Sequence, residues 1–129
     1  MGKSLMDSNT VIYFLSGSLP NSANITIENK IQSNHIAISD VSKMEILGFN
    51  FSDPEEEQAF INFVNAIDVI SISEDIVNQT IVFRKIKKIK LPDAIIAATV
   101  HVEQLEIITR NISDFKGFGL TCIDPFTDL

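Results

Sequence analysis

Short apolar segments rich in β-branched residues alternate with segments of helical character along the whole chain. The apolar segments cover residues 5–6, 35–38, 69–72, 106–109 and 120–123. Between them, residues 11–15, 22–32, 42–49, 54–67, 73–86 and 94–101 have helix-capping residues or apolar residues at helical spacing. This alternation favours a three-layer α/β fold, in which a central parallel sheet of four or five strands is flanked by helices.

The length of the chain fits one domain, which we expect to span residues 1–129. Of the 129 residues, 45% are hydrophobic, which is enough for a sizeable core. A chain of this length leaves no room for a second domain. No segment approaches the ~18 apolar residues of a membrane span, and the N-terminus lacks the apolar part of a secretory signal. The single cysteine, Cys122, cannot form an internal disulfide. We therefore expect a cytoplasmic protein without membrane association.

The apolar faces of three helices can be assigned from the spacing of their residues. The helix over 54–67 should bury Phe60, Ile61, Phe63, Val64 and Ile67. The helix over 73–86 should present an apolar face of Ile76, Val77, Ile81 and Val82. The helix over 94–101 is the most apolar of all, and we expect it in the core beneath the sheet.

Charge is distributed unevenly along the chain. The formal net charge of -7 argues against nonspecific binding to nucleic acid or to anionic membranes. Five of the ten basic residues, however, form one short run: Arg84, Lys85, Lys87, Lys88 and Lys90. A basic helix end interacts favourably with the helix dipole and needs no ligand, but this run also precedes an acid closely and could hold phosphate groups. Both interpretations stay open.

Four carboxylates stand where predicted strands and helices meet: Asp7, Glu45, Asp93 and Asp114. The carboxyl ends of parallel strands lie along one edge of the sheet, so residues far apart in sequence can converge there. Carboxylates gathered without a cation repel one another and need a counter-charge. Mg²⁺ and Mn²⁺ prefer oxygen ligands and would supply it. The pattern predicts a divalent-metal site.

Each of these acids also has an ordinary structural interpretation. Asp7 could cap a helix, and Glu45 could complete a capping box with Ser42. Asp93 could lie in the first turn of a helix, and Asp114 could cap a loop. One acid alone favours the structural interpretation, whereas the four together indicate a shared site.

Four segments of the chain resemble the signatures of PIN domains, especially of the VapC-type toxins of bacterial toxin-antitoxin pairs. Residues 6–12, Met-Asp-Ser-Asn-Thr-Val-Ile, resemble the opening Asp-x-Asn signature, and residues 38–48 resemble the second, in which a Glu stands on a helix after the second strand. Residues 91–99, Leu-Pro-Asp and an Ala-rich helix, resemble the third. Residues 109–115, Thr-Arg-Asn-Ile-Ser-Asp-Phe, resemble the fourth. The last two are the most specific.

The resemblance implies a PIN-like fold and an endoribonuclease that depends on Mg²⁺ or Mn²⁺. Asp7 and Asp93 would be the principal metal ligands, with Glu45 and Asp114 as additional ligands directly or through water. The residues that would orient these ligands are Asn9, Thr109 and Asn111. The resemblance further implies an RNA substrate, a homodimer and inhibition by a small cognate antitoxin of the VapB kind.

Two other functions remain compatible with the sequence. A PIN-like module could bind RNA or protein without cleaving, although such a module has little reason to keep a repulsive acidic cluster. An aspartate-dependent phosphatase with a similar α/β layout would need an acid two residues after its nucleophilic Asp, and Asn9 occupies that place after Asp7.

Overall fold

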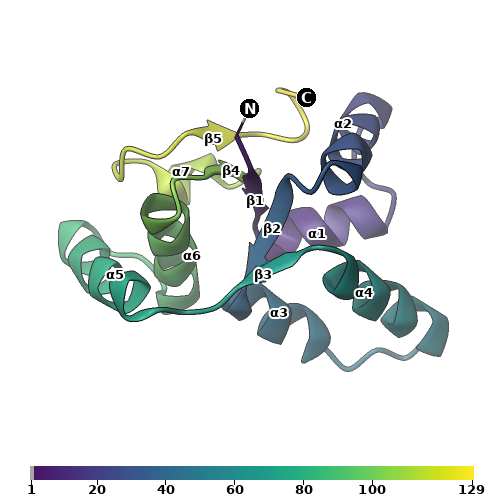
Figure 1. The fold of residues 1–129 in the computed structure, drawn as a ribbon, viewed down its shortest axis with the longest axis horizontal. Helices are drawn as coiled ribbons and strands as arrows, with labels where there is room; N and C mark the ends of the chain where they lie inside the picture. Colours follow the sequence, from purple (N-terminus) through teal and green to yellow (C-terminus); the bar gives the residue numbers. More distant parts are fainter. Residues whose placement is uncertain (1) are drawn as a thin grey trace.

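The computed structural model describes residues 2–129, and Figure 1 shows a parallel sheet with helices on both of its faces. The strands are β1 (Ser4–Met6), β2 (Ile36–Ser39), β3 (Asp68–Ile70), β4 (Glu106–Ile108) and β5 (Cys122–Ile123). The helices are α1 (Ser8–Leu15), α2 (Asn21–Gln32), α3 (Asp40–Leu47), α4 (Pro54–Ala66), α5 (Glu74–Ile86), α6 (Leu91–Val102) and α7 (Ile112–Phe115). The predicted PIN-like α/β fold is confirmed. Met1, with which the predicted domain begins, lies outside the described residues.

The sheet has the strand order β3-β2-β1-β4-β5, and every pairing is parallel. β1 is therefore the central strand, paired with β2 on one side and β4 on the other. Because all strands point the same way, each strand-to-helix connection begins at the same edge of the sheet. This carboxyl edge is where the sequence places its acids. None of the helices in the described chain has both the length and the apolar run that a bilayer crossing requires.

Two apolar clusters hold the layers together, one on each face of the sheet. Leu5 and Ile107 point toward α5, α6 and α7, while Met6 and Ile108 point toward α1, α2 and α4. This alternation follows from the two-residue period of a strand. α6 lies in the core, as predicted, and contributes five buried side chains to its cluster, more than any other element. α3 contributes to both clusters and so closes the end of the sheet.

The start of α3 differs from the prediction. The helix begins at Asp40, because the side chain of Ser39 accepts a hydrogen bond from the Ser42 backbone N–H at 3.2 Å. The predicted capping box of Ser42 and Glu45 is wrong, since Ser42 lies inside the helix and the cap is already filled. Glu45 is consequently left without a capping role.

The buried face of α5 also differs from the prediction. Ile76 is buried, together with Thr80 and Phe83, which lie one and two turns further along the same face. Val77, Ile81 and Val82 were expected in the core but are 46%, 52% and 49% exposed. The sequence pattern contained two adjacent apolar stripes, and packing against α6 selected one of them.

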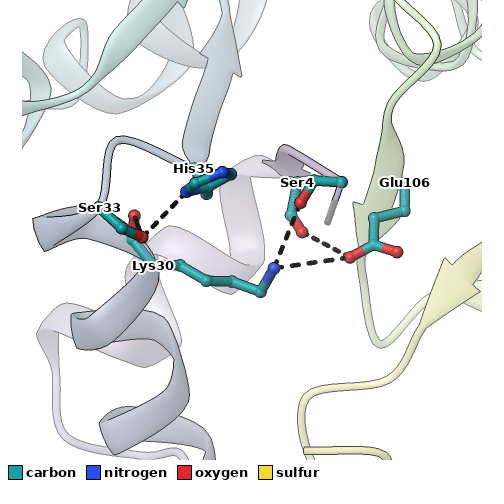
Figure 2. A network of polar contacts seen from close by, with 6 residues as sticks. Ser4, Lys30, Ser33, His35 and Glu106 are labelled. Atoms are coloured by element: carbon teal, nitrogen blue, oxygen red, sulfur yellow. Dashed lines mark hydrogen bonds and ion pairs between the residues drawn. The ribbon is translucent and has the colours of Figure 1, made fainter.

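A polar network closes the opposite, amino edge of the sheet. Figure 2 shows Lys30 reaching toward Glu106 beside Ser4. The Ser4 hydroxyl donates to Glu106 Oε1 at 2.8 Å, and Lys30 Nζ lies 3.7 Å from the same oxygen. Lys3 forms an ion pair with Asp68 nearby. The half-buried acids at this edge are thus paired with cations.

The assignment of the α5 face gives a direct stability prediction. Ile76→Ala removes a fully buried side chain and should destabilise the protein by about 2–5 kcal/mol. Val82→Ala, at a position of the same helix that is 49% exposed, should change the free energy of unfolding by no more than about 0.5 kcal/mol. Urea denaturation measures both. Equal losses for the two variants would show that the described face is wrong.

Candidate active site

The four predicted acids all lie at the carboxyl edge of the sheet. Asp7 directly follows β1, and Glu45 lies on α3, which directly follows β2. Asp93 is in the first turn of α6, which runs back from this edge toward the start of β4. Asp114 is on α7, shortly after β4. Parallel topology therefore brings four distant segments to one side of the molecule.

Asp7 is buried and held by both of its oxygens. Its side chain is 7% exposed, and Oδ1 accepts from the backbone N–H of Thr10 at 2.9 Å, so Asp7 does cap α1. Oδ2 accepts from the Thr109 hydroxyl at 2.5 Å. That hydroxyl in turn accepts from the Asn111 backbone N–H at 3.0 Å. Capping and membership of a shared site are therefore compatible for Asp7, and Thr109 has the contact that an orienting residue requires.

Glu45 is linked to Asp7's neighbour by a contact that the sequence did not reveal. The hydroxyl of Ser8 lies 2.6 Å from Glu45 Oε1 and 2.9 Å from the hydroxyl of Ser42. The only sequence signal was the position of Ser8, directly after Asp7. The approach of α1 to α3 that creates the contact is a tertiary feature. Ser8 thus fixes the exposed Glu45 relative to the start of α1.

Asp93 shows that the four acids form one electrostatic unit. Burial is the largest cause that raises the pKa of Asp93 above its usual value, and three carboxylates raise it further: Asp114, Glu45 and Asp7. Lys90 lowers it. Since carboxylates from three other segments act on one group, the acids lie close enough to repel one another.

Asp114 and the two predicted asparagines surround this unit. The side-chain amide of Asn111 donates to Asp114 Oδ2. Asn9 is exposed and lines a hollow of about 250 Å³ next to Asp7 and Asn111. All seven side chains expected at the site therefore lie at or beside the carboxyl edge, but their roles stay predictions.

The four acids form no ion pair within the described residues, although Lys90 partly offsets the repulsion at Asp93. Within residues 2–129, the ion pairs are Lys3 with Asp68 and Lys30 with Glu106, both away from this edge. The described residues also contain no group of three His, Cys, Asp or Glu side chains drawn together tightly enough for a ready-made metal site. The donor chemistry fits a hard divalent ion, because all four side chains are carboxylates and three of them repel Asp93. The expected Mg²⁺ or Mn²⁺ stays a prediction.

Most of the basic run borders the acids. A hollow of about 470 Å³, called the basic hollow below, is lined by Arg84, Lys87, Lys88, Ile89, Lys90, Asp93 and Asp114. Lys85 is not part of its lining. Lys87 is already engaged, because its ammonium donates to the Ser113 carbonyl at 3.1 Å and lies 5.0 Å above the Phe118 ring. Cations and acids thus share one surface depression.

The fold and the site define a parallel α/β protein with an acidic site at the carboxyl edge of its sheet. The sequence matches the family described as PIN domain over residues 4–117. The chain belongs to the PIN domain family, as its motifs indicated. No curated protein matches it in a sequence comparison.

Several solved structures are similar to the chain over almost its whole length. A chain of the toxin-antitoxin complex from Klebsiella pneumoniae is 31% identical, with a TM-score of 0.74, covering 95% of this chain and 98% of that one. Chains of DNA-bound VapBC from Salmonella typhimurium and of FitAcB from Neisseria gonorrhoeae are 20% and 18% identical, with TM-scores of 0.78 and 0.76. These two matches cover 96% of this chain and 98% and 99% of the others. At such identities they show the fold alone.

The raised pKa of Asp93 predicts how stability depends on pH. A carboxyl whose pKa rises on folding binds its proton more tightly in the folded state, so stability is lost as the pH rises from the unfolded pKa through the folded one. At pH 7 without divalent ions, the wild-type protein has lost this stability in full, whereas Asp93→Asn has no carboxyl at this position to deprotonate. We expect Asp93→Asn to melt at the same or a higher temperature than wild type, with the difference shrinking on acidification.

The matched control for this measurement is Asp75→Asn. Asp75 occupies the first turn of α5, as Asp93 occupies the first turn of α6. Loss of a first-turn acid weakens the interaction with the helix dipole, so Asp75→Asn should lower the melting temperature slightly. If Asp93→Asn lowers it by as much, Asp93 acts as an ordinary first-turn acid and the repulsion account is wrong.

Proposed function

We propose that this chain is a metal-dependent endoribonuclease that cleaves RNA with Mg²⁺ or Mn²⁺. One observation carries the proposal: Asp93 feels the charge of three other acids and also lines the basic hollow. Acids suit a divalent ion, and the cations beside them suit the phosphates of a nucleic acid. A site of this composition supports phosphodiester hydrolysis.

In the proposed site the acids coordinate the metal, and polar side chains fix the acids through hydrogen bonds. Asp7 and Asp93 are the principal ligands, and Glu45 and Asp114 complete the set directly or through water. A bound ion would make a water nucleophilic near neutral pH and neutralise charge on the transition state. Thr109 restrains the Asp7 carboxylate, and Asn111 restrains Asp114.

The basic hollow has the proposed role of holding RNA beside the acids. Arg84, Lys88 and Lys90 line it and are exposed, so their charges can meet phosphates. Lys85 lies outside its lining, so it is dropped from the proposed contact. A cytoplasmic location follows from an RNA substrate.

A PIN-like module that binds without cleaving is the second candidate. The observation that favours it is the lack, within residues 2–129, of a ready-made metal cluster. The repulsion at Asp93, which Lys90 only partly offsets, argues the other way, because a binding module gains nothing from it. Cleavage assays decide between the two.

An antitoxin is the proposed protein partner, in line with the likeness to chains of toxin-antitoxin complexes. A mostly apolar hollow of about 240 Å³ lies next to the acids and is the proposed binding surface. It is lined by Ile12, Glu45, Ile46, Phe49, Phe51, Glu56 and Phe60. Glu45 belongs to this hollow and to the acidic unit. An apolar partner segment seated there could place a basic side chain among the acids and so replace the metal's charge.

A homodimer is proposed through the exposed apolar stripe of α5. Val77 and Ile81 are about half exposed and line a hollow of about 200 Å³ with the exposed Leu91. Clustered apolar side chains of this kind are typical of surfaces that proteins bury on association.

Metal binding can be tested by thermal stability together with cleavage. Mn²⁺ should raise the melting temperature of wild type, because a ligand at 100 times its Kd stabilises by about 2.7 kcal/mol. The shift should be much smaller for Asp93→Asn, which should also fail to cleave total RNA in Mn²⁺. Equal shifts would count against the site, and a metal-dependent shift without cleavage by wild type would favour the binding module.

The basic hollow can be tested by the salt dependence of RNA binding. Lys88→Gln should reduce the magnitude of the negative slope of log K for RNA binding against log salt by about 0.7, the value for one contact to a single strand. Lys85→Gln removes the same charge from the same helix end but outside the hollow, so its slope should match wild type. Identical slopes for all three proteins would refute the contact.

The dimer can be tested by light scattering after size exclusion. Wild type should elute with twice the 14.3 kDa chain mass, and Ile81→Glu should elute as a monomer. Ile25→Glu is the matched control, since Ile25 is 51% exposed and Ile81 52%. A monomeric wild type, or dissociation by both variants, would contradict the assignment to α5.

A further inference from the structure

We propose that Arg110 forms, with Asn9, Tyr13 and Asn111, a second subsite for single-stranded RNA. It lies beside Asp7, in a hollow that shares no lining residue with the basic hollow, and binds a phosphate next to the one that is cleaved. The inference rests on the proposed ribonuclease function and extends it. None of the motif assignments gave Arg110 or Tyr13 a role.

The subsite is a polar hollow that adjoins the acidic unit. Its volume is about 250 Å³, and its lining residues are Asp7, Asn9, Tyr13, Arg110 and Asn111. Tyr13 comes from α1, whereas Arg110 and Asn111 come from the segment between β4 and α7. The hollow is thus formed by two segments that the parallel pairing of β1 with β4 and the hydrogen bond from Thr109 to Asp7 bring together.

Arg110 is a positioned cation with free hydrogen-bond donors. Its guanidinium carbon lies 4.0 Å from the centroid of the Phe126 ring, which is cation-π distance. Phe126 is itself held edge-on by Tyr13, at 5.3 Å between ring centroids and 85° between ring planes. The guanidinium is exposed and, among residues 2–129, forms no ion pair with any carboxylate. A guanidinium fixed by its face keeps its edge donors available for a phosphate.

The two hollows are lined by different members of the same group of acids. Asp7 lines the Arg110 hollow, and Asp93 and Asp114 line the basic hollow. A hydrogen bond from Asn111, in one lining, to Asp114, in the other, joins the two walls. A strand of RNA whose cleaved phosphate sits at the acids must continue in both directions. Arg110 supplies the cation for the phosphate on the part of the strand that the basic hollow does not contact.

The lining selects single-stranded nucleic acid over an isolated anion. Asp7 would repel a free anion in the hollow, so the site favours a phosphate that is tethered to the rest of a bound strand. The amides of Asn9 and Asn111 offer donors and acceptors that can meet base edges. Base edges are accessible in this way in single strands, whereas the grooves of an A-form duplex hide most of them.

The test is the salt dependence of binding to a labelled 12-nucleotide single-stranded RNA, measured in chelator so that no divalent ion supports cleavage. Arg110→Gln should reduce the magnitude of the negative slope of log K against log salt by about 0.7, as expected for one lost phosphate contact. Arg110→Lys keeps the charge and should keep the slope. Lys30→Gln removes a cation from the opposite edge of the sheet (Figure 2) and should also leave the slope unchanged.

The outcomes separate the subsite from the function on which it rests. A slope for Arg110→Gln equal to that of wild type, or an equal loss for Lys30→Gln, would overturn the subsite even if wild type cleaves RNA in Mn²⁺. Absence of RNA binding by wild type would overturn it as well. Binding with the expected slopes but without cleavage in Mn²⁺ would support the subsite and reject the nuclease.

Discussion

Four carboxylates that converge at one edge of the sheet without an ion-pair partner among residues 2–129 are the feature on which the rest of this structure depends. At the amino edge of the sheet, Glu106 and Asp68 are paired with lysines. At the carboxyl edge, burial and three neighbouring acids raise the pKa of Asp93 instead. The folded chain therefore tolerates repulsion at one edge and avoids it at the other. This difference between the two edges of one sheet supports the proposal that a cation from outside the chain completes the site.

The scaffold makes this repulsion tolerable because its stability comes from elsewhere. Two apolar clusters lie on the two faces of the sheet, and α6, which carries Asp93, is the helix with the most buried side chains. Asp7 follows the central strand and is anchored by Thr109, which directly follows the neighbouring strand β4. Asp7 and Asp93 thus project from well-packed elements, and the cations that border them lie on more exposed segments. A well-packed support for these two acids suits their proposed role as metal ligands.

Local patterns in the sequence predicted much of this arrangement, and tertiary contacts account for what they missed. The alternation of segments gave the parallel α/β fold, and the motifs around Asp93 and Asp114 gave the family. The capping box at Glu45 failed because Ser39, one element earlier, fills the cap. The contact from Ser8 to Glu45 and the packing of Arg110 on Phe126 depend on how α1, α3 and the C-terminal segment approach one another. No spacing rule encodes such approaches.

The most direct test of the central claim is a crystal structure of the protein grown with Mn²⁺ and examined by anomalous scattering at the manganese edge. The account predicts at least one Mn²⁺ between the carboxylates of Asp7 and Asp93, with Glu45 or Asp114 close by directly or through water. Manganese bound elsewhere, or no manganese at the carboxyl edge of the sheet, would contradict it.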